Sequence, residues 1–216
     1  MDIVASLLDL VLHLDVHLAV LIRDYGSWVY AILFGIIFAE TGLVVTPFLP
    51  GDSLLFVAGA LVAIGGLDIH VLVALLVAAA ILGNTVNYTI GRFVGMKLFT
   101  DHGSRWLNPA HLERTHAFYE RHGGIAVVIS RFIPIVRTYV PFVAGLGRMT
   151  YPRFTLFNAI GAALWVTTLC YAGHFFGNEP IVKENLSLII VAIVAVTSLP
   201  VVVALVRSRS RDHADA

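Results

Sequence analysis

Four ionisable residues lie in otherwise apolar parts of this sequence. Glu40 and Asp52 flank one segment rich in Gly and Pro, and Arg131 and Arg137 lie in a second such segment. A charge at the centre of a bilayer costs about 2.5–3.5 kcal/mol on insertion scales, so such residues usually mark a functional site. Arginine stays charged and its planar guanidinium suits phosphate, which makes Arg131 and Arg137 candidates for binding an anionic headgroup. Glu40 and Asp52 can take up protons in a low-dielectric site and are candidate proton carriers.

Other interpretations of these residues stay open. The four charges could neutralise one another as salt bridges between the two segments, which is compatible with function if substrate or a proton opens them. Asp52 could instead cap a helix, because Pro-Gly-Asp-Ser before an apolar run suits that role. Asn84 and Asn87 could hydrogen-bond to a broken segment, although such residues are more often structural.

The composition predicts an integral membrane protein. Apolar residues make up 58% of the 216 residues and charged residues 13%, whereas soluble domains have roughly 45–50% and 25%. The net charge is zero, so nothing in it favours nucleic acid as a partner. The nine histidines show no metal-ligand spacing, and the single Cys170 cannot form an intrachain disulfide. We therefore expect neither a metal nor another cofactor.

The apolar segments are of two kinds. Residues 26–65 and 125–147 are each broken by Gly or Pro, and two short apolar arms around a break are typical of a re-entrant helical hairpin. On unbroken helices neither pair of charges would share a face, so the breaks are needed for each pair to converge. The residues expected to make the breaks are Pro47, Pro50, Gly51, Pro134 and Pro141. The segments long enough to cross a hydrocarbon core of about 30 Å are 70–90, 154–177 and 187–206.

The placement of Lys and Arg predicts the topology. The loops 91–124 and 148–153 and the basic tail 207–216 hold ten of the fourteen Lys and Arg residues. The positive-inside rule puts all three, and so the C-terminus, in the cytoplasm. Residues 125–147 must then enter and leave on that side. The first hairpin opens outward if residues 3–22 span, but they could instead lie in the interface.

A weak internal repeat accompanies the two broken segments. Phe56-Val-Ala-Gly59 recurs as Phe142-Val-Ala-Gly145, and each is followed by a Tyr/Gly pattern. A four-residue match in so apolar a chain arises easily by chance. Broken segments at matching places in two halves nevertheless indicate a transporter site at the membrane midplane. We therefore predict one membrane-embedded, all-α polytopic domain over residues 1–206, with two opposed hairpins packed among transmembrane helices as an inverted repeat.

Two long motifs resemble the signature segments of the bacterial DedA family. They are Phe38-Ala-Glu-Thr-Gly-Leu-Val-Val-Thr-Pro-Phe-Leu-Pro-Gly-Asp-Ser53 and Ser130-Arg-Phe-Ile-Pro-Ile-Val-Arg-Thr-Tyr-Val-Pro-Phe-Val-Ala-Gly145. The resemblance implies a multi-pass protein of the bacterial inner membrane, related to eukaryotic VTT-domain lipid scramblases. It also implies a part in recycling undecaprenyl phosphate and in transport that depends on the proton motive force. The essential acids and arginines of that family correspond to Glu40, Asp52, Arg131 and Arg137.

The leading hypothesis is therefore a transporter that moves a lipid phosphate across the membrane, with protons as a possible coupling ion. The lipid would be a polyprenyl phosphate such as undecaprenyl phosphate, or a phospholipid. The alternative is a proton-coupled exporter or antiporter of small cations or drugs, with Glu40 and Asp52 as the coupling acids. An enzyme acting on lipid phosphates is disfavoured, because no Pro-Ser-Gly-His element or metal-ligand cluster is present. A scaffold would not explain four charges in apolar segments.

Overall fold

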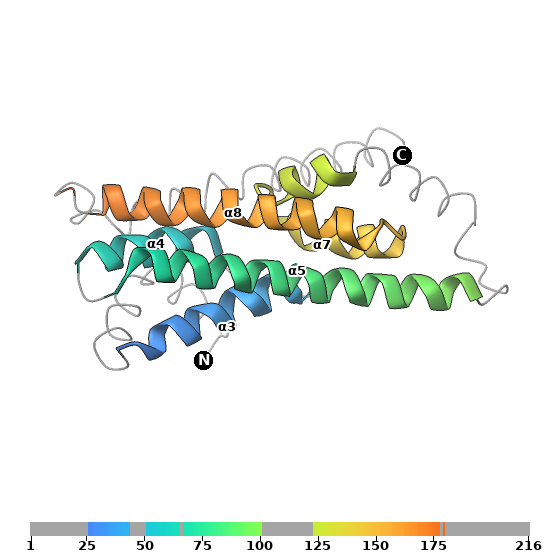
Figure 1. The fold of residues 1–216 in the computed structure, drawn as a ribbon, viewed down its shortest axis with the longest axis horizontal. Helices are drawn as coiled ribbons and strands as arrows, with labels where there is room; N and C mark the ends of the chain where they lie inside the picture. Colours follow the sequence, from blue (N-terminus) through green and yellow to red (C-terminus); the bar gives the residue numbers. More distant parts are fainter. Residues whose placement is uncertain (1–25, 44–50, 65–66, 101–122, 178, 180–216) are drawn as a thin grey trace, which may run out of the picture.

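The computed structural model describes residues 26–43, 51–64, 67–100, 123–177 and Glu179, and this part of the chain forms helices without any strand (Figure 1). The all-α prediction is confirmed for these residues. The helices are α3 (Trp28–Gly42), α4 (Gly51–Ile64), α5 (Ile69–Thr100), α7 (Pro134–Leu146) and α8 (Tyr151–Phe176), and residues 123–130 are also helical. The predicted segments 3–22 and 187–206 and the basic tail lie outside the described residues.

The two long helices α5 and α8 form the centre of the structure. They pack against each other, and the start of α5 lies at the same end of the molecule as the end of α8 (Figure 1). The apolar stretches Ile69–Val94 and Tyr151–Phe176 have 26 residues each. At about 1.5 Å per residue each is roughly 39 Å long, enough to cross a hydrocarbon core of about 30 Å. By length and composition both helices can therefore span a membrane.

The ends of the long helices follow from local sequence. Asp68 accepts hydrogen bonds from the backbone N–H groups of His70 (2.7 Å) and Val71 (3.0 Å) and so begins α5. Pro152 lies in the first turn of α8, where a proline costs no intrahelical hydrogen bond. α8 agrees with the predicted segment 154–177. α5 continues to Thr100 instead of ending at residue 90, because the residues that follow include no proline and several good helix formers.

The short helices lie along opposite halves of this central pair. α3 and α4 lie beside the half that holds the start of α5, and α7 lies beside the other half (Figure 1). α3 and α7 pack on α5, and α4 packs on α8. The backbone of Gly42 at the end of α3 approaches Gly83 near mid-length of α5. α3 has 15 residues and reaches only about 22 Å. Short helices that start at opposite ends of the molecule thus meet at its mid-length, as two opposed hairpins require. That these hairpins enter and leave a bilayer on the same side stays a prediction.

The repeated Phe-Val-Ala-Gly motif makes two equivalent helix crossings. On α4, a Cβ at Gly59 would clash with the carbonyl of Cys170 on α8. On α7, a Cβ at Gly145 would clash with the carbonyl of Tyr88 on α5. Glycines of the long helices complete both crossings, because Gly173 faces the carbonyl of Phe56 and Gly91 faces that of Phe142. Small residues let helix backbones approach closely in membranes. The last arm of each broken segment therefore crosses the long helix of the other half in the same way.

The predicted breaks are present in part. α3 ends at Gly42 and α4 begins at Gly51, whereas Pro47 and Pro50 lie outside the described residues. A turn ends at Ile133, and α7 begins at Pro134. The break predicted at Pro141 is wrong, because α7 continues through this residue to Leu146. A proline removes one backbone hydrogen bond, and membrane helices tolerate that loss when neighbouring elements support them.

Buried polar residues separate two apolar clusters along α5 and α8. One cluster contains Leu72 to Ala80 of α5, residues of α3 and α4, and Ala162 to Cys170 of α8. The other contains Tyr88 of α5 and Phe154 of α8. Asn84, Asn87 and Asn158 fall between them and are buried. This polar layer is where the ends of the short helices meet.

Candidate functional site

All four predicted charged residues are buried in the polar layer. The exposed fractions are 0% for Glu40, 9% for Asp52, 2% for Arg131 and 5% for Arg137. Glu40 lies in the last turn of α3, Asp52 in the first turn of α4 and Arg137 in the first turns of α7. Arg131 lies in the turn that precedes α7. The ends of short helices thus carry every one of these charges to mid-length of the molecule.

Arg137 binds both acids at once. Its Nη1 donates to Asp52 Oδ1 at 2.9 Å, and its Nη2 donates to Glu40 Oε1. Hydrogen bonds between ionised partners are roughly twice as strong as neutral ones. One guanidinium therefore ties the end of α3 to the start of α4, and the predicted salt bridges between the two broken segments are present for this arginine.

Arg131 has neutral partners instead. Its Nη2 donates to Asn158 Oδ1 at 2.5 Å and to the carbonyl of Ala80 at 3.3 Å. Among the described residues it contacts no carboxylate, and its Nε has no hydrogen-bond partner there. The expectation that the acids of one segment meet both arginines of the other therefore holds for Arg137 alone. The reason is local, because Arg131 precedes the break and its side chain extends toward α5 and α8.

Trp165 of α8 joins the two arginines to the acids. Its Nε1 donates to Asp52 Oδ1 at 2.8 Å. The guanidinium carbon of Arg137 lies 5.0 Å from the centroid of its ring, and that of Arg131 lies 5.9 Å away. Both distances allow a cation–π interaction. Sequence reasoning missed Trp165, although a tryptophan in the middle of a predicted span, away from the membrane interfaces where this residue is enriched, is the signal that could have found it.

Three buried asparagines link the long helices to the short ones. Asn87 Nδ2 donates to the carbonyls of Thr138 on α7 (2.8 Å) and Thr41 on α3 (3.4 Å). The sequence-based hydrogen-bonding role is thus confirmed for Asn87. With its amide rotated, which suits its neighbours better, Asn84 donates to the carbonyl of Thr41 (3.2 Å) and accepts from Arg131 Nη2 (2.9 Å). Asn158, which the sequence analysis did not select, is the third polar residue inside an apolar span.

The start of α4 fits closely against Glu40. α4 begins at Gly51, so Asp52 lies inside the first turn and the interpretation of Asp52 as the N-cap is wrong. A Cβ at Gly51 would overlap the carboxylate of Glu40. Glu40 Oε2 has no hydrogen-bond partner in the described part of the chain. The break predicted at Gly51 therefore also provides the space that the carboxylate occupies.

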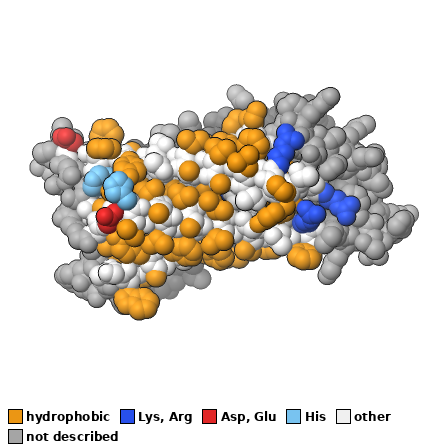
Figure 2. All heavy atoms as spheres, in the orientation of Figure 1, with side chains coloured by type: hydrophobic (Ala, Val, Ile, Leu, Met, Phe, Trp, Pro, Cys, Tyr) orange, Lys and Arg blue, Asp and Glu red, His pale blue; other side chains and the backbone are white. Residues whose placement is uncertain are grey.

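Opposite charges gather at the two ends of the molecule. Figure 2 shows Lys and Arg at one end, and Asp, Glu and His at the other. The described residues concerned are Arg92, Arg148 and Arg153 near the end of α5 and the start of α8, and Asp68, His70, His174 and Glu179 near the start of α5 and the end of α8. Within the described ranges, no three His, Cys, Asp or Glu side chains gather as a metal site would need.

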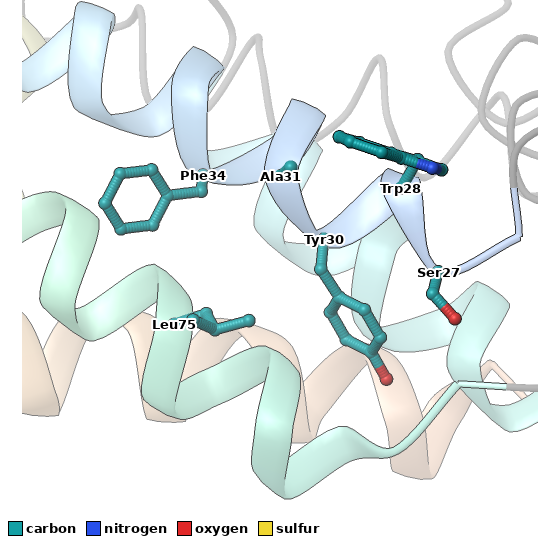
Figure 3. A pocket seen from close by; sticks show the side chains of 6 residues that line it. All are labelled: Ser27, Trp28, Tyr30, Ala31, Phe34 and Leu75. Atoms are coloured by element: carbon teal, nitrogen blue, oxygen red, sulfur yellow. The ribbon is translucent and has the colours of Figure 1, made fainter.

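Two apolar hollows lie on the surface of the described residues. One, of about 460 Å³, lies between α3 and α5, with Phe34 of α3 and Leu75 of α5 in its lining (Figure 3). The other, of about 350 Å³, follows the second broken segment and reaches Ser130, next to Arg131. Both are lined mainly by apolar side chains, and the four charges are not part of either lining.

Comparison with known proteins identifies related sequences. The VTT domain family matches residues 49–175. The chain is 55% identical over 211 residues to Protein DedA of Escherichia coli strain K12, covering 97% of this chain and 96% of the relative. It is 42% identical over 179 residues to an uncharacterized membrane protein of Mycobacterium leprae (82% and 80% covered). It is 41% identical over 155 residues to Inner membrane protein YqjA of E. coli strain K12 (70% and 69% covered). No solved structure matches the chain significantly.

Proposed function

The chain belongs to the DedA family of VTT-domain membrane proteins, and from this premise we propose that it translocates a lipid phosphate across the bacterial inner membrane. The headgroup would bind at Arg131 and Arg137 while the apolar chain stays in lipid. Undecaprenyl phosphate, another polyprenyl phosphate or an anionic phospholipid would fit this description. Glu40 and Asp52 would exchange protons with the two sides of the membrane.

The observation that carries the proposal is that two guanidinium groups are buried at mid-length of the molecule. One of them, that of Arg131, is hydrogen-bonded to neutral partners only among the described residues. Arg131 is 2% exposed and lies beside Arg137 on the ring of Trp165. Phosphate oxygens are strong acceptors for a guanidinium, and the match improves when the site excludes water. A site of this kind suits a small anion that passes through the protein while its attached chain stays outside.

The apolar hollow next to Arg131 supports the same assignment. It lies along the second broken segment and has a volume of about 350 Å³. Its described lining consists of Ile125, Ala126, Ile129, Ser130, Ile133, Val136 and Val140. An acyl or isoprenoid chain held there would have its headgroup close to the turn that carries Arg131.

Proton coupling would act through the bonds of Arg137. When both acids are ionised they hold this guanidinium, and it cannot bind phosphate fully. A proton on either carboxylate weakens that hold, and Glu40 Oε2, which has no hydrogen-bond partner among the described residues, could accept the proton. A bound phosphate in turn adds negative charge next to the acids and favours uptake of a proton, since linkage between two ligands is reciprocal. Headgroup and proton would thus bind together.

The charge distribution and the two crossings support the predicted topology. The end with Arg92, Arg148 and Arg153 would face the cytoplasm under the positive-inside rule, with the C-terminus on that side. The hairpin of α3 and α4 would then open outward and the hairpin that ends in α7 inward. The matching glycine crossings support an inverted repeat. Single cysteines at Tyr151 and His70, placed in a C170A background, should react with impermeant reagents from opposite sides of the membrane.

Reconstitution tests the function directly. Purified protein in liposomes would be supplied with undecaprenyl phosphate, phosphatidic acid or phosphatidylcholine, and headgroup movement between leaflets would be measured with and without a pH gradient. We expect movement of the two phosphate monoesters and little of phosphatidylcholine. R131Q and R137Q should each abolish movement.

An exposed arginine provides the matched control. R92Q removes one positive charge at the end of the bundle and should leave headgroup movement unchanged, because Arg92 is exposed and far along α5 from the acids. The proposal fails if R131Q and R137Q, inserted and folded normally, both still translocate the phosphate lipids.

The alternative of a cation exporter keeps one observation in its favour. Two carboxylates share the single guanidinium of Arg137, so a cationic substrate could replace it. In that case the same liposomes would move a small organic cation when a pH gradient is imposed, and R137Q would bind the cation more tightly. Cation movement that ignores the gradient would exclude this alternative.

A further inference from the structure

The two buried arginines have different partners although both lie on the ring of Trp165. Arg137 is bound by the carboxylates of Glu40 and Asp52. Arg131 is bound by the amide of Asn158 and the carbonyl of Ala80. The difference is chemical, because a carboxylate cancels the charge of a guanidinium, whereas an amide oxygen orients the group and leaves its charge in place.

Asn158 can present only its oxygen to Arg131. Its Nδ2 donates to the carbonyl of Ile81 on α5 at 3.1 Å. The amide is therefore fixed, and Oδ1, which also lies 3.1 Å from the amide of Asn84, accepts from Arg131 Nη2 at 2.5 Å. A carboxylate in the same place would receive the same hydrogen bond but would also neutralise the arginine.

α8 also makes room for the stem of this arginine. A Cβ at Gly161 would come 3.0 Å from Arg131 Cδ and 3.3 Å from its Nε. That Nε is buried and has no hydrogen-bond partner among the described residues. A buried donor without a partner is costly in a folded protein. The Nε of Arg137 is also without a partner among these residues, so what sets Arg131 apart is that none of its described partners is a carboxylate.

We propose that Asn158 is a positioning residue that holds Arg131 in a charge-unpaired state, which makes Arg131 the primary headgroup-binding arginine. Arg137 stays bound to the carboxylates of Glu40 and Asp52. It binds the headgroup only after one of these carboxylates is protonated and releases it. This assignment rests on the proposed lipid-phosphate function and adds that the two arginines have different binding roles. It also assigns a role to a residue that lies outside both signature motifs.

The test replaces the amide of Asn158 by a carboxylate of the same shape. N158D would pair with Arg131 and compete with phosphate for it. Binding of dioctanoyl phosphatidic acid to purified protein would be followed by the fluorescence of Trp165 in a W28F/W106F background, with dioctanoyl phosphatidylcholine as the reference ligand. We expect N158D to weaken phosphatidic acid binding at least about tenfold, which corresponds to about 1.4 kcal/mol.

A second pair of measurements separates positioning from simple structural damage. N158S keeps a neutral acceptor and should lose less affinity than N158D. In the liposome assay, N158D should raise the apparent KM for the lipid phosphate while the rate at saturation changes less, since Arg131 is masked but the site is otherwise intact. If N158D does not fold, N158S carries the test, because the inference then predicts a partial loss of phosphatidic acid affinity with little change in the rate at saturation.

The outcomes distinguish this inference from the function on which it rests. If the wild-type protein does not prefer phosphatidic acid over phosphatidylcholine, both proposals are overturned. If the wild type has this preference and N158D keeps it in full, only the present inference is overturned. Equal losses in N158S and N158D, with the rate at saturation lost as well, would also overturn it, because they would show a structural role.

Discussion

Removal of Arg137 tests how the buried charges divide between stability and function. In the R137Q variant, Glu40 and Asp52 remain buried but lose the guanidinium that binds both. Breaking a buried pair by removing one partner costs about 3–5 kcal/mol, because the remaining charge is left without compensation. Arg137 makes two hydrogen bonds to carboxylates, and each such bond contributes about 1.5–3 kcal/mol. The loss of both leads to a similar free-energy cost. We therefore expect R137Q to lose about 3–5 kcal/mol of its free energy of unfolding.

The triple variant E40Q/D52N/R137Q removes all three charges of this cluster together. Removing every charge of the cluster together leaves no buried charge without compensation, which is the main cost in R137Q. Asn at position 52 also keeps an oxygen that can accept from Trp165 Nε1. The triple variant should therefore regain most of the stability that R137Q loses, yet it should not move lipid phosphate in liposomes.

Unfolding in mixed detergent and SDS micelles, followed by circular dichroism, measures the stability of each variant, and the liposome assay measures movement. R92Q serves as the control; it removes one hydrogen bond, from Arg92 Nη1 to the Tyr88 hydroxyl (2.9 Å), and should cost no more than about 1.5 kcal/mol. If the triple variant is as unstable as R137Q, the charges are needed for the fold and the reasoning is wrong. If it is stable and still transports, the ion cluster is not part of the transport site.

Three further predictions concern single contacts. W165F removes the N–H group that donates to Asp52 but keeps an aromatic ring, so it should lower the free energy of unfolding by about 1.5–3 kcal/mol. The loss should be clearly smaller in a D52N background, and an equal loss in both backgrounds would contradict the contact. G145A forces a Cβ against the facing carbonyl of α5 and should cost about 1–3 kcal/mol, whereas G35A, with nothing within 4 Å of its Cβ, should not destabilise the protein. Two backbone N–H groups at the start of α5 hold the pKa of Asp68 below its ordinary value. The stability that this carboxylate contributes is therefore present above the ordinary carboxyl pKa and is lost as the pH falls through the lowered value. The difference in melting temperature between the wild type and D68A should accordingly shrink on acidification, and a constant difference would contradict the cap.

Local sequence features account for much of the helical framework. Apolar runs of sufficient length predict α5 and α8 because helix length and hydropathy depend on neighbouring residues only. The Gly and Pro positions predict helix ends near Gly42, Gly51 and Pro134 for the same reason. Pro141 is the exception, since its missing hydrogen bond is tolerated within α7, where packing on α5 supports the helix. α5 extends to Thr100, beyond the predicted end at residue 90, because charged residues do not by themselves end a helix.

The sequence alone determined that this chain is an α-helical membrane protein and that Glu40, Asp52, Arg131 and Arg137 lie in broken apolar segments. Both properties follow from residue type and spacing along the chain. Only the tertiary structure decided that Arg137 binds both acids, that Arg131 binds Asn158, and that both arginines lie over the ring of Trp165. Those contacts depend on how far each helix is rotated and shifted against its neighbour. The close glycine crossings set that rotation, and contacts between residues distant in sequence are not encoded in any local pattern.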